Sequence, residues 1–408
     1  MTLPAVLRHR DFRRYLAGVV FSQLGTQGTF AVMLYHVYEL TGSTVQVGLV
    51  GAAQGVAVLV LAPLGGHLAD RLDRKILLQV SQVASGLITA VLAVVTLTGE
   101  VQAWQVLLAS LLNSSAATFD RPVRKAVIPA MVPRDELVRA LALMNPSMQT
   151  SRLLGPGVGG VLIAVGGPGL MYALDAATFA ALILVVKTLS IPNNPPTDSA
   201  LHFRSSVSEA IRFIRSRPLI PHLLRLDISA MLFAAYRAVL PAIAVDVLDV
   251  GPTGYGVLAA TPPVGAILGG ILVYRLSGRS LRAGRIIIAT TIAYGLSAVL
   301  LAQADTFVVA MMAAAGLGVF DAIGTTLRNA AIMLETPDEM MGRVNALYTM
   351  SAAGGPALGE LQIGWLSSLL GVTAALTIGG LVPILFATAV GLTARTVRDY
   401  RTTAYPPN

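Results

Sequence analysis

The chain has 408 residues, of which 55% are hydrophobic and only 12% are charged, and its formal net charge is +8. Soluble domains usually carry about 25% charged residues, so this composition excludes a soluble globular protein and indicates one that lies in a membrane. The absence of cysteine excludes disulfides, cysteine-ligated zinc sites and thiol chemistry.

Twelve apolar stretches are long enough to cross a bilayer, which takes roughly 20 residues per helix. Six lie before residue 190 and six after residue 220. We therefore expect an all-α membrane protein of twelve transmembrane helices in two six-helix bundles, over residues 1–190 and 221–408, the second with a short cytoplasmic tail. The predicted spans are 15–38, 45–67, 76–97, 103–122, 140–165, 169–189, 221–245, 254–275, 284–302, 306–330, 344–368 and 372–394.

The basic residues are distributed unevenly between the two sides of these spans. With a cytoplasmic N-terminus, none of the outer loops contains Lys or Arg, and apart from Arg152 and Arg237 the 29 basic residues lie on or near the inner side. The positive-inside rule requires this asymmetry, and an even number of spans keeps the basic tail inside. We therefore expect both termini in the cytoplasm, and we attribute the positive charge to membrane topology, with no nucleic-acid partner.

The inner loop between the second and third spans combines glycines with charges in the run Gly65–Lys75. Paired glycines let helices approach closely, and Asp70 can accept hydrogen bonds from a neighbouring arginine. In this position the run resembles the signature of the major facilitator superfamily. The resemblance implies a charged gate at the inner ends of the bundles, for which we expect Gly66, Asp70, Arg71, Arg74, Asp120 and Arg124.

Two stretches repeat one order of motifs. Phe119–Pro156 contains Phe-Asp, then Pro-Arg-Asp-Glu-Leu, an arginine and Gly-Pro, and Phe320–Pro356 contains Phe-Asp, Pro-Asp-Glu-Met, an arginine and Gly-Pro. A duplicated bundle of apolar helices is typical of secondary transporters, in which two pseudo-symmetric halves rock about a central site. We therefore predict transport by alternating access.

Four runs narrow the resemblance within the superfamily. They are similar to the exporter subgroup that includes the siderophore (enterobactin) exporters and drug and macrolide exporters, and they cover 119–125, 152–160, 236–242 and 336–348. This similarity implies an integral protein of a bacterial plasma (inner) membrane. Gly155, Pro156, Gly159 and Gly160 also resemble the antiporter motif of the superfamily, although close helix packing alone would explain the same glycines.

The polar segment 191–220 separates the two groups of spans. It opens with a proline-rich run that cannot continue a helix, and Ser206–Glu209 has the pattern of a capping box, which predicts a helix start. An apolar face follows, made by Val207, Ile211 and Ile214. We predict an amphipathic helix at the inner membrane surface that joins the two bundles; a plain linker is the alternative.

Charges inside spans cost a few kcal/mol each by insertion scales, so each needs a partner or a role. We expect proton coupling at one of three acids: Glu360, Asp321 and Asp120. Each has a structural alternative, namely an ion pair with Arg237 for Glu360, pairing with Arg328 for Asp321, and an inner charge network with Asp70 and Arg71 for Asp120. We expect Asp175 to be an outer-rim residue rather than a carrier.

Arginine binds anions through a planar fork and stacks on aromatic rings, so Arg152 and Arg237 suit an anionic or catechol-bearing substrate. Further polar groups are expected to line the cavity: Gln23, Gln27, Gln54, Gln149, Tyr236, Asn329 and Tyr348. Hydrogen bonds between helices are the alternative role for each of these.

Together these patterns predict a proton-coupled exporter of an amphipathic small molecule such as a siderophore, acting as a monomer in the lipid bilayer without a cofactor or metal. The alternatives are a multidrug or macrolide efflux pump and a membrane scaffold or receptor that transports nothing. An enzyme is not expected, because the histidines are scattered and no serine nucleophile elbow is present.

Overall fold

The computed structural model describes residues 5–71, 73–189, 203–276 and 281–401, and side chains at 5, 62–71, 125, 126, 145, 203–207 and 353 lie outside the description. The described chain is helical.

The first half contains α1 Arg10–Thr41, α2 Thr44–Arg71, α3 Arg74–Leu97, α4 Ala103–Val127, α5 Leu137–Gly166 and α6 Pro168–Thr188, with short 3-10 turns at Ala5–Arg8, Ile128–Ala130 and Arg134–Glu136. The second half contains α7 Phe203–Ser216, α8 Ile220–Phe233, α9 Leu240–Ala242, the π-turn Ile243–Val247, α10 Gly251–Leu276, α11 Ala283–Ala302, α12 Phe307–Leu334, α13 Asp338–Leu370, α14 Val372–Thr393 and α15 Arg395–Arg398.

Eleven of the twelve predicted spans each fall on one of these helices, to within one residue at the ends. Among the described residues, seven helices are long and apolar enough on their own to cross a membrane, namely α3, α6, α10, α11, α12, α14 and the stretch Thr44–Leu61 of α2. The helices α1, α4, α5 and α13 are longer than 20 residues, but more polar residues interrupt their apolar stretches. Their length meets the thickness of a bilayer core.

The chain forms two compact units, and each unit includes a short segment from the other half of the sequence. Unit 1 comprises Met1–Gly42, Val56–Leu201 and Gly251–Ala260, and unit 2 comprises Ser43–Gly55, His202–Val250 and Thr261–Asn408. The first turns of α2 therefore belong with the second half of the chain, and the first turns of α10 belong with the first half. The division into bundles over residues 1–190 and 221–408 stays a prediction.

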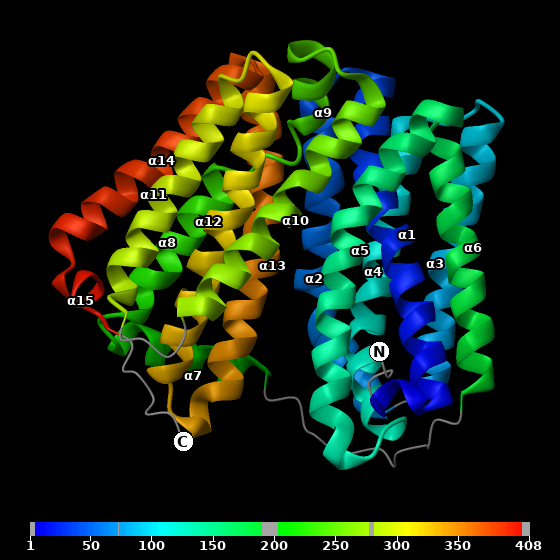
Figure 1. Cartoon of the computed structure of the whole chain (residues 1–408), viewed down its shortest axis with the longest axis horizontal. Helices are drawn as coiled ribbons and strands as arrows, with labels where there is room; N and C mark the ends of the chain where they lie inside the picture. Colours follow the sequence, from blue (N-terminus) through cyan, green and yellow to red (C-terminus); the bar gives the residue numbers. More distant parts are fainter. Residues whose placement is uncertain (1–4, 72, 190–202, 277–280, 402–408) are drawn as a thin grey trace. The chain divides into compact units, whose positions relative to one another are not determined.

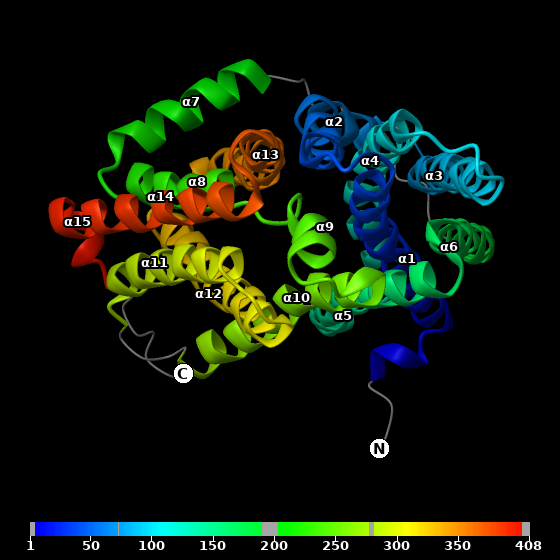
Figure 2. The same cartoon turned by 90° about the horizontal axis from the view of Figure 1, so that it is seen from above.

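Within unit 1, α1 packs between α5 and α6, and α3 packs on α4 and α6 (Figure 2). Its core includes Phe12, Tyr15, Leu78 and Leu182, all fully buried. Within unit 2, α11 packs on α12 and α14, and α13 packs on α8 and α14 (Figure 1). The core of this unit is aliphatic, with Leu223, Leu226 and Ile287 fully buried. Burial of such side chains holds the helices of each unit together.

The seventh predicted span is not one helix, which corrects the expectation of a continuous span over 221–245. The α8 helix ends at Phe233, and the backbone is irregular until α9 begins at Leu240. Pro241 contributes to the break, because in a continuous helix its ring would crowd the carbonyl of Arg237 four residues earlier. Ala234, Ala238 and Val239 are fully buried, so protein encloses the break, as broken helices at membrane depth require.

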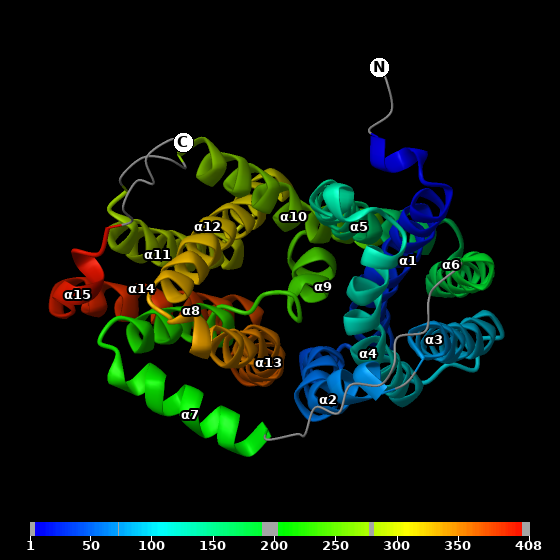
Figure 3. The ribbon, with the colours of Figure 1, turned by 90° about the horizontal axis from the view of Figure 1, so that it is seen from below.

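The helix predicted in the linker is α7, and it begins at Phe203, one turn before the predicted capping box. Figure 3 shows α7 lengthwise where α13 is seen end-on, and α7 contacts both α13 and α8. Its apolar residues Ala210 and Ile214 are buried, and Ile214 belongs to the core of unit 2. The apolar face of α7 therefore packs on protein, and a role at the membrane surface stays a prediction.

An ion pair between Glu209 of α7 and Arg343 of α13 supports this packing, with 44% and 43% of the two side chains exposed. Because exposed ion pairs contribute roughly 0 to 1 kcal/mol, we expect Glu209→Gln to lower stability by about 0.5 kcal/mol or less. Thermal unfolding of the detergent-solubilised protein would measure the change. A loss above about 2 kcal/mol would show that the pair, rather than the apolar face, anchors α7.

Candidate functional site

The break after α8 places Tyr236 and Arg237 on non-helical backbone inside unit 2. A guanidinium nitrogen of Arg237 lies 2.6 Å from a carboxylate oxygen of Glu360 on α13. The two partners differ in exposure, because 44% of the Arg237 side chain is accessible and only 2% of the Glu360 side chain is. The carboxylate is therefore buried in protein, whereas its cation is partly accessible.

Glu360 also fills the contact between α13 and the first turns of α2. A Cβ at Gly51 would overlap the Glu360 carboxylate, and one at Gly55 would overlap Ala357. Near the end of the same contact, the Thr44 hydroxyl donates a 2.8 Å hydrogen bond to the carbonyl of Gly364. The small residues of α2 thus let α13 approach closely, with the buried carboxylate of Glu360 at the crossing.

A second buried ion pair in unit 2 joins Arg328 of α12 to Asp227 of α8, and both side chains are nearly inaccessible. Arg328 also donates to the Thr325 hydroxyl at 3.0 Å, and that hydroxyl donates to Asp321 at 3.0 Å. Asp227 is therefore the ion-pair partner of Arg328. Asp321 is linked to Arg328 only through the Thr325 hydroxyl. Sequence inspection missed Asp227, although an acid inside the predicted span 221–245 is the same signal that singled out Glu360.

Among the gate residues, the structure joins Asp120 to Arg124 one turn later on α4. Asp120 also accepts a 2.9 Å hydrogen bond from the side-chain amide of Gln82, and the Tyr15 hydroxyl donates to the carbonyl of Arg124 at 3.1 Å. This network ties α1, α3 and α4 together within unit 1. Arg74 begins α3, whereas the side chains of Gly66, Asp70 and Arg71 lie outside the described residues, so their part in a gate stays a prediction.

Asp175 corrects an expectation. It lies two turns into α6 with 1% of its surface exposed, so it is buried rather than at the outer rim. Its carboxylate meets α1 at Gly25, where a Cβ would overlap it, and it accepts a 3.4 Å hydrogen bond from the Thr178 hydroxyl. The start of α6 at Pro168 and the tight approach to α1 together place this acid in the interior.

The remaining predicted cavity residues divide between the units. In unit 1, Arg152 is exposed and donates a 3.3 Å hydrogen bond to Gln149 on the same helix. Most of the others are partly exposed, with Gln23 and Gln27 on α1, Gln54 on α2, Tyr236 after α8 and Asn329 on α12. Tyr348 of α13 is 8% exposed and lies in the core of unit 2. Their roles as substrate contacts stay predictions.

The antiporter-like motif makes tight helix contacts. A Cβ at Gly155 would lie 2.8 Å from the backbone nitrogen of Gly28 on α1, and one at Gly160 would lie 2.7 Å from the Cα of Gly256 on α10. The glycines of α5 therefore allow close contact with both α1 and α10. At the contact with α10, Gly160 packs against Gly256. Both Gly160 and Gly256 lie in the predicted outer halves of their helices.

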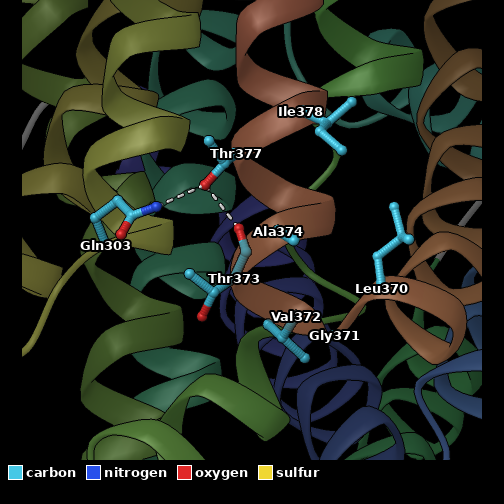
Figure 4. Close-up of a pocket in the computed structure, with 8 residues that line it drawn as sticks. All are labelled: Gln303, Leu370, Gly371, Val372, Thr373, Ala374, Thr377 and Ile378. Atoms are coloured by element: carbon cyan, nitrogen blue, oxygen red, sulfur yellow. Dashed lines mark hydrogen bonds between the residues drawn. The ribbon is translucent and has the colours of Figure 1, made fainter.

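Two surface hollows lie apart from these residues. One of about 440 Å³ lies at the start of α14 and the end of α11, where Gln303 donates a 3.0 Å hydrogen bond to the Thr377 hydroxyl (Figure 4). The other, of about 380 Å³, lies between α3 and α4 and has a mostly apolar lining. Neither contains a predicted site residue, so the buried charges rather than these hollows define the candidate site.

Known proteins are similar to this chain over nearly its whole length. The family model described as transmembrane secretion effector matches residues 2–404. An enterobactin exporter of Citrobacter koseri is 28% identical over 386 residues, which is 93% of this chain and 91% of that protein. The enterobactin exporter of Salmonella typhimurium is 28% identical over 415 residues, covering 100% of this chain and 97% of that one.

Solved structures agree on the fold. A mutant of the nucleoside transporter NupG matches with a TM-score of 0.77 at 14% identity, over 94% of this chain and all of that one. A POT family transporter matches with a TM-score of 0.75 at 11% identity over 95% and 96% of the chains. A bacterial homologue of the lysosomal transporter Spinster gives 0.70 at 13% identity over 97% of each. These similarities establish the predicted transporter fold.

Proposed function

Because the chain belongs to the transmembrane secretion effector family of major facilitator transporters, we propose that it is a proton-coupled exporter of an amphipathic small molecule that carries an anionic or catechol group. Siderophores of the enterobactin class have this chemistry, and the relatives at 28% identity carry that substrate in their names. The proposed cycle is alternating access in a bacterial plasma membrane, with a proton moving inward as the substrate moves outward.

The observation that carries the substrate proposal is the unequal exposure of the Arg237–Glu360 pair. A guanidinium with 44% of its side chain accessible can receive an oxygen pair from a ligand, and its planar fork suits carboxylates and catecholates. Glu360 supplies the counter-charge when no ligand is bound. Neighbouring Tyr236 adds an aromatic ring at the same helix break. Unwound backbone of this kind is where transporters of several folds bind their substrates.

The driving force is sufficient for export. One charge that crosses 100 mV releases about 2.3 kcal/mol. Since a tenfold concentration ratio costs about 1.36 kcal/mol, one net charge per cycle sustains roughly 50-fold outward pumping.

Variants of Arg237 test the substrate proposal. In proteoliposomes, we expect Arg237→Gln to slow enterobactin transport at least about tenfold, because a charge-assisted bidentate contact contributes roughly 1.5 kcal/mol or more. Arg237→Lys should recover only part of the rate, since an ammonium lacks the planar fork. Arg225→Gln, which removes an exposed arginine of α8, is the matched control and should retain the wild-type rate.

The same assay separates the alternatives. Wild-type enterobactin transport by Arg237→Gln would contradict an anion site at Arg237. Transport of a macrolide, with no enterobactin transport by the wild-type protein, would favour a drug efflux pump. Failure to move either probe, in vesicles that hold correctly folded protein, would favour the non-transporting scaffold.

A further inference from the structure

The proposed function places a constraint on where the coupling proton binds. A substrate anion that takes the place of Glu360 at Arg237 leaves Glu360 without its cation and so favours protonation of that acid. Substrate and proton would then be bound together and would leave on the same side. Proton-driven export requires that the proton and the substrate leave on opposite sides, because each crosses the membrane in a different half of the cycle. The exchangeable proton therefore requires a carboxyl group that does not share Arg237.

The described part of the chain contains four buried acidic side chains: Asp120, Asp175, Asp227 and Glu360. Three of them pair with an arginine, as described above. Asp175 differs, because its neighbours are the Thr178 hydroxyl and the glycine face of α1, and no basic side chain pairs with it in the described residues. A charged carboxylate is costly to bury without a counter-ion, so at this site the neutral, proton-bound acid is favoured.

Three titratable side chains, Glu39, His36 and Tyr172, lie between Asp175 and the predicted outer end of unit 1. Glu39 is exposed near the end of α1, and His36 lies one turn below it with 3% of its surface accessible. A ring nitrogen of His36 lies 3.0 Å from the hydroxyl oxygen of Tyr172 on α6. Asp175 follows Tyr172 by three residues, so the two share one face of that helix.

Lys75 and Arg152, on helices that pack against α1 or α6, have hydrogen-bond partners other than Asp175. On α3, the charged residues are Arg74 and Lys75 at its first turn, where Lys75 donates to the carbonyls of Lys187 and Leu189 at the other end of α6. On α5, Arg152 donates to Gln149. On α1, Tyr35 stacks near Tyr255 of α10 with ring centroids 5.2 Å apart. The groups that face Asp175 from α1 are Gly25 and the buried Thr29, which do not titrate.

We propose that Asp175 is the proton-carrying carboxyl group of this exporter, and that Glu39, His36 and Tyr172 form the route by which protons from the outer side reach it. This inference rests on the proposed proton-coupled export and assigns the proton to a residue of unit 1, whereas the proposed substrate contact, Arg237, belongs to unit 2. Protonation forms an O–H bond on Asp175 with a proton taken from outer water, and deprotonation on the inner side breaks that bond.

Infrared spectroscopy of the purified full-length protein tests the proton site without a substrate. A protonated carboxyl group has a carbonyl stretch that is distinct from that of a carboxylate. At neutral pH we expect such a band from a group shielded from solvent exchange, lost in Asp175→Asn and retained in Glu360→Gln. Because asparagine keeps the shape of the neutral acid, the variant should fold as the wild type does. A band that persists in Asp175→Asn, or disappears in Glu360→Gln, would overturn the assignment.

Transport in vesicles with an acidic lumen tests the coupling, with enterobactin as the probe. A gradient of one pH unit should give the wild type about tenfold accumulation for one proton per cycle. Asp175→Asn should accumulate none, yet should still exchange labelled for unlabelled enterobactin at no less than half the wild-type rate. Undiminished pH-driven accumulation by Asp175→Asn would contradict the inference. A wild-type protein that transports enterobactin without responding to pH would instead contradict the proposed function itself.

The route has its own test. Tyr172→Phe should slow pH-driven accumulation several-fold while leaving exchange unchanged, because it removes the hydroxyl beside His36. The matched control is Tyr294→Phe, since the buried Tyr294 hydroxyl donates to a backbone carbonyl of unit 2 and lies outside this route. Equal rates for the two variants would contradict the route.

Discussion

Replacing Arg328 with methionine is expected to destabilise the protein by about 3 to 5 kcal/mol, because the change strands the buried Asp227 without its counter-ion. Arg328 is 2% exposed and Asp227 is 4% exposed, so neither charge can turn to solvent when its partner is lost. The pair also connects α8 to α12 within unit 2. Thermal and chemical unfolding in detergent would give the loss.

A double variant separates the cost of an unpaired charge from the value of the pair. We expect Arg328→Met with Asp227→Asn to recover most of the loss, since no buried charge then remains. A double variant as unstable as Arg328→Met alone would show that packing, not charge, dominates here.

The second large effect is expected at the crossing of α5 and α10. Gly160→Ala should reduce transport at least about tenfold and cost about 1 to 3 kcal/mol, because its Cβ would meet the backbone of Gly256 and overpacking of a tight contact has this cost. Backbone atoms on both sides leave no flexible side chain to move. The outer portions of α5 and α10 would therefore be held apart.

Gly157 provides a control within the same motif. A Cβ at Gly157 meets nothing within 4 Å, so Gly157→Ala should preserve transport and stabilise α5 by up to about 1 kcal/mol through helix propensity. Equal transport rates for the two alanine variants would contradict a role for the glycine crossing. The pair would also decide between the two interpretations of the motif, since Gly157 belongs to the sequence pattern but not to the contact.

The transmembrane helices could be predicted because the thickness of the bilayer core sets the number of apolar residues in each one. Each predicted span lies on a helix, since roughly 20 apolar residues are needed wherever a helix crosses. The exception is the seventh span, which is long enough to cross but is broken between Phe233 and Leu240. Pro241 was the available signal, because its ring excludes a helical carbonyl at Arg237.

Partners of the buried charges were less predictable, because they come from different helices. Asp321 and Arg328 lie two turns apart on α12, which made their pairing the natural expectation. The structure instead brings Asp227 of α8 to Arg328, and a threonine links Asp321 to the pair. Asp175 was misplaced for a related reason: its depth depends on the approach of Gly25 on α1, which no pattern within α6 records.

Proton movement during transport tests the central claim most directly. Vesicles with equal pH on both sides and a pH indicator in the lumen would be given enterobactin outside, so that inside-out exporters carry it inward. Exchange for protons predicts that the lumen becomes more alkaline at a rate proportional to enterobactin uptake. Uptake with an unchanged or more acidic lumen would contradict proton-coupled export by this protein.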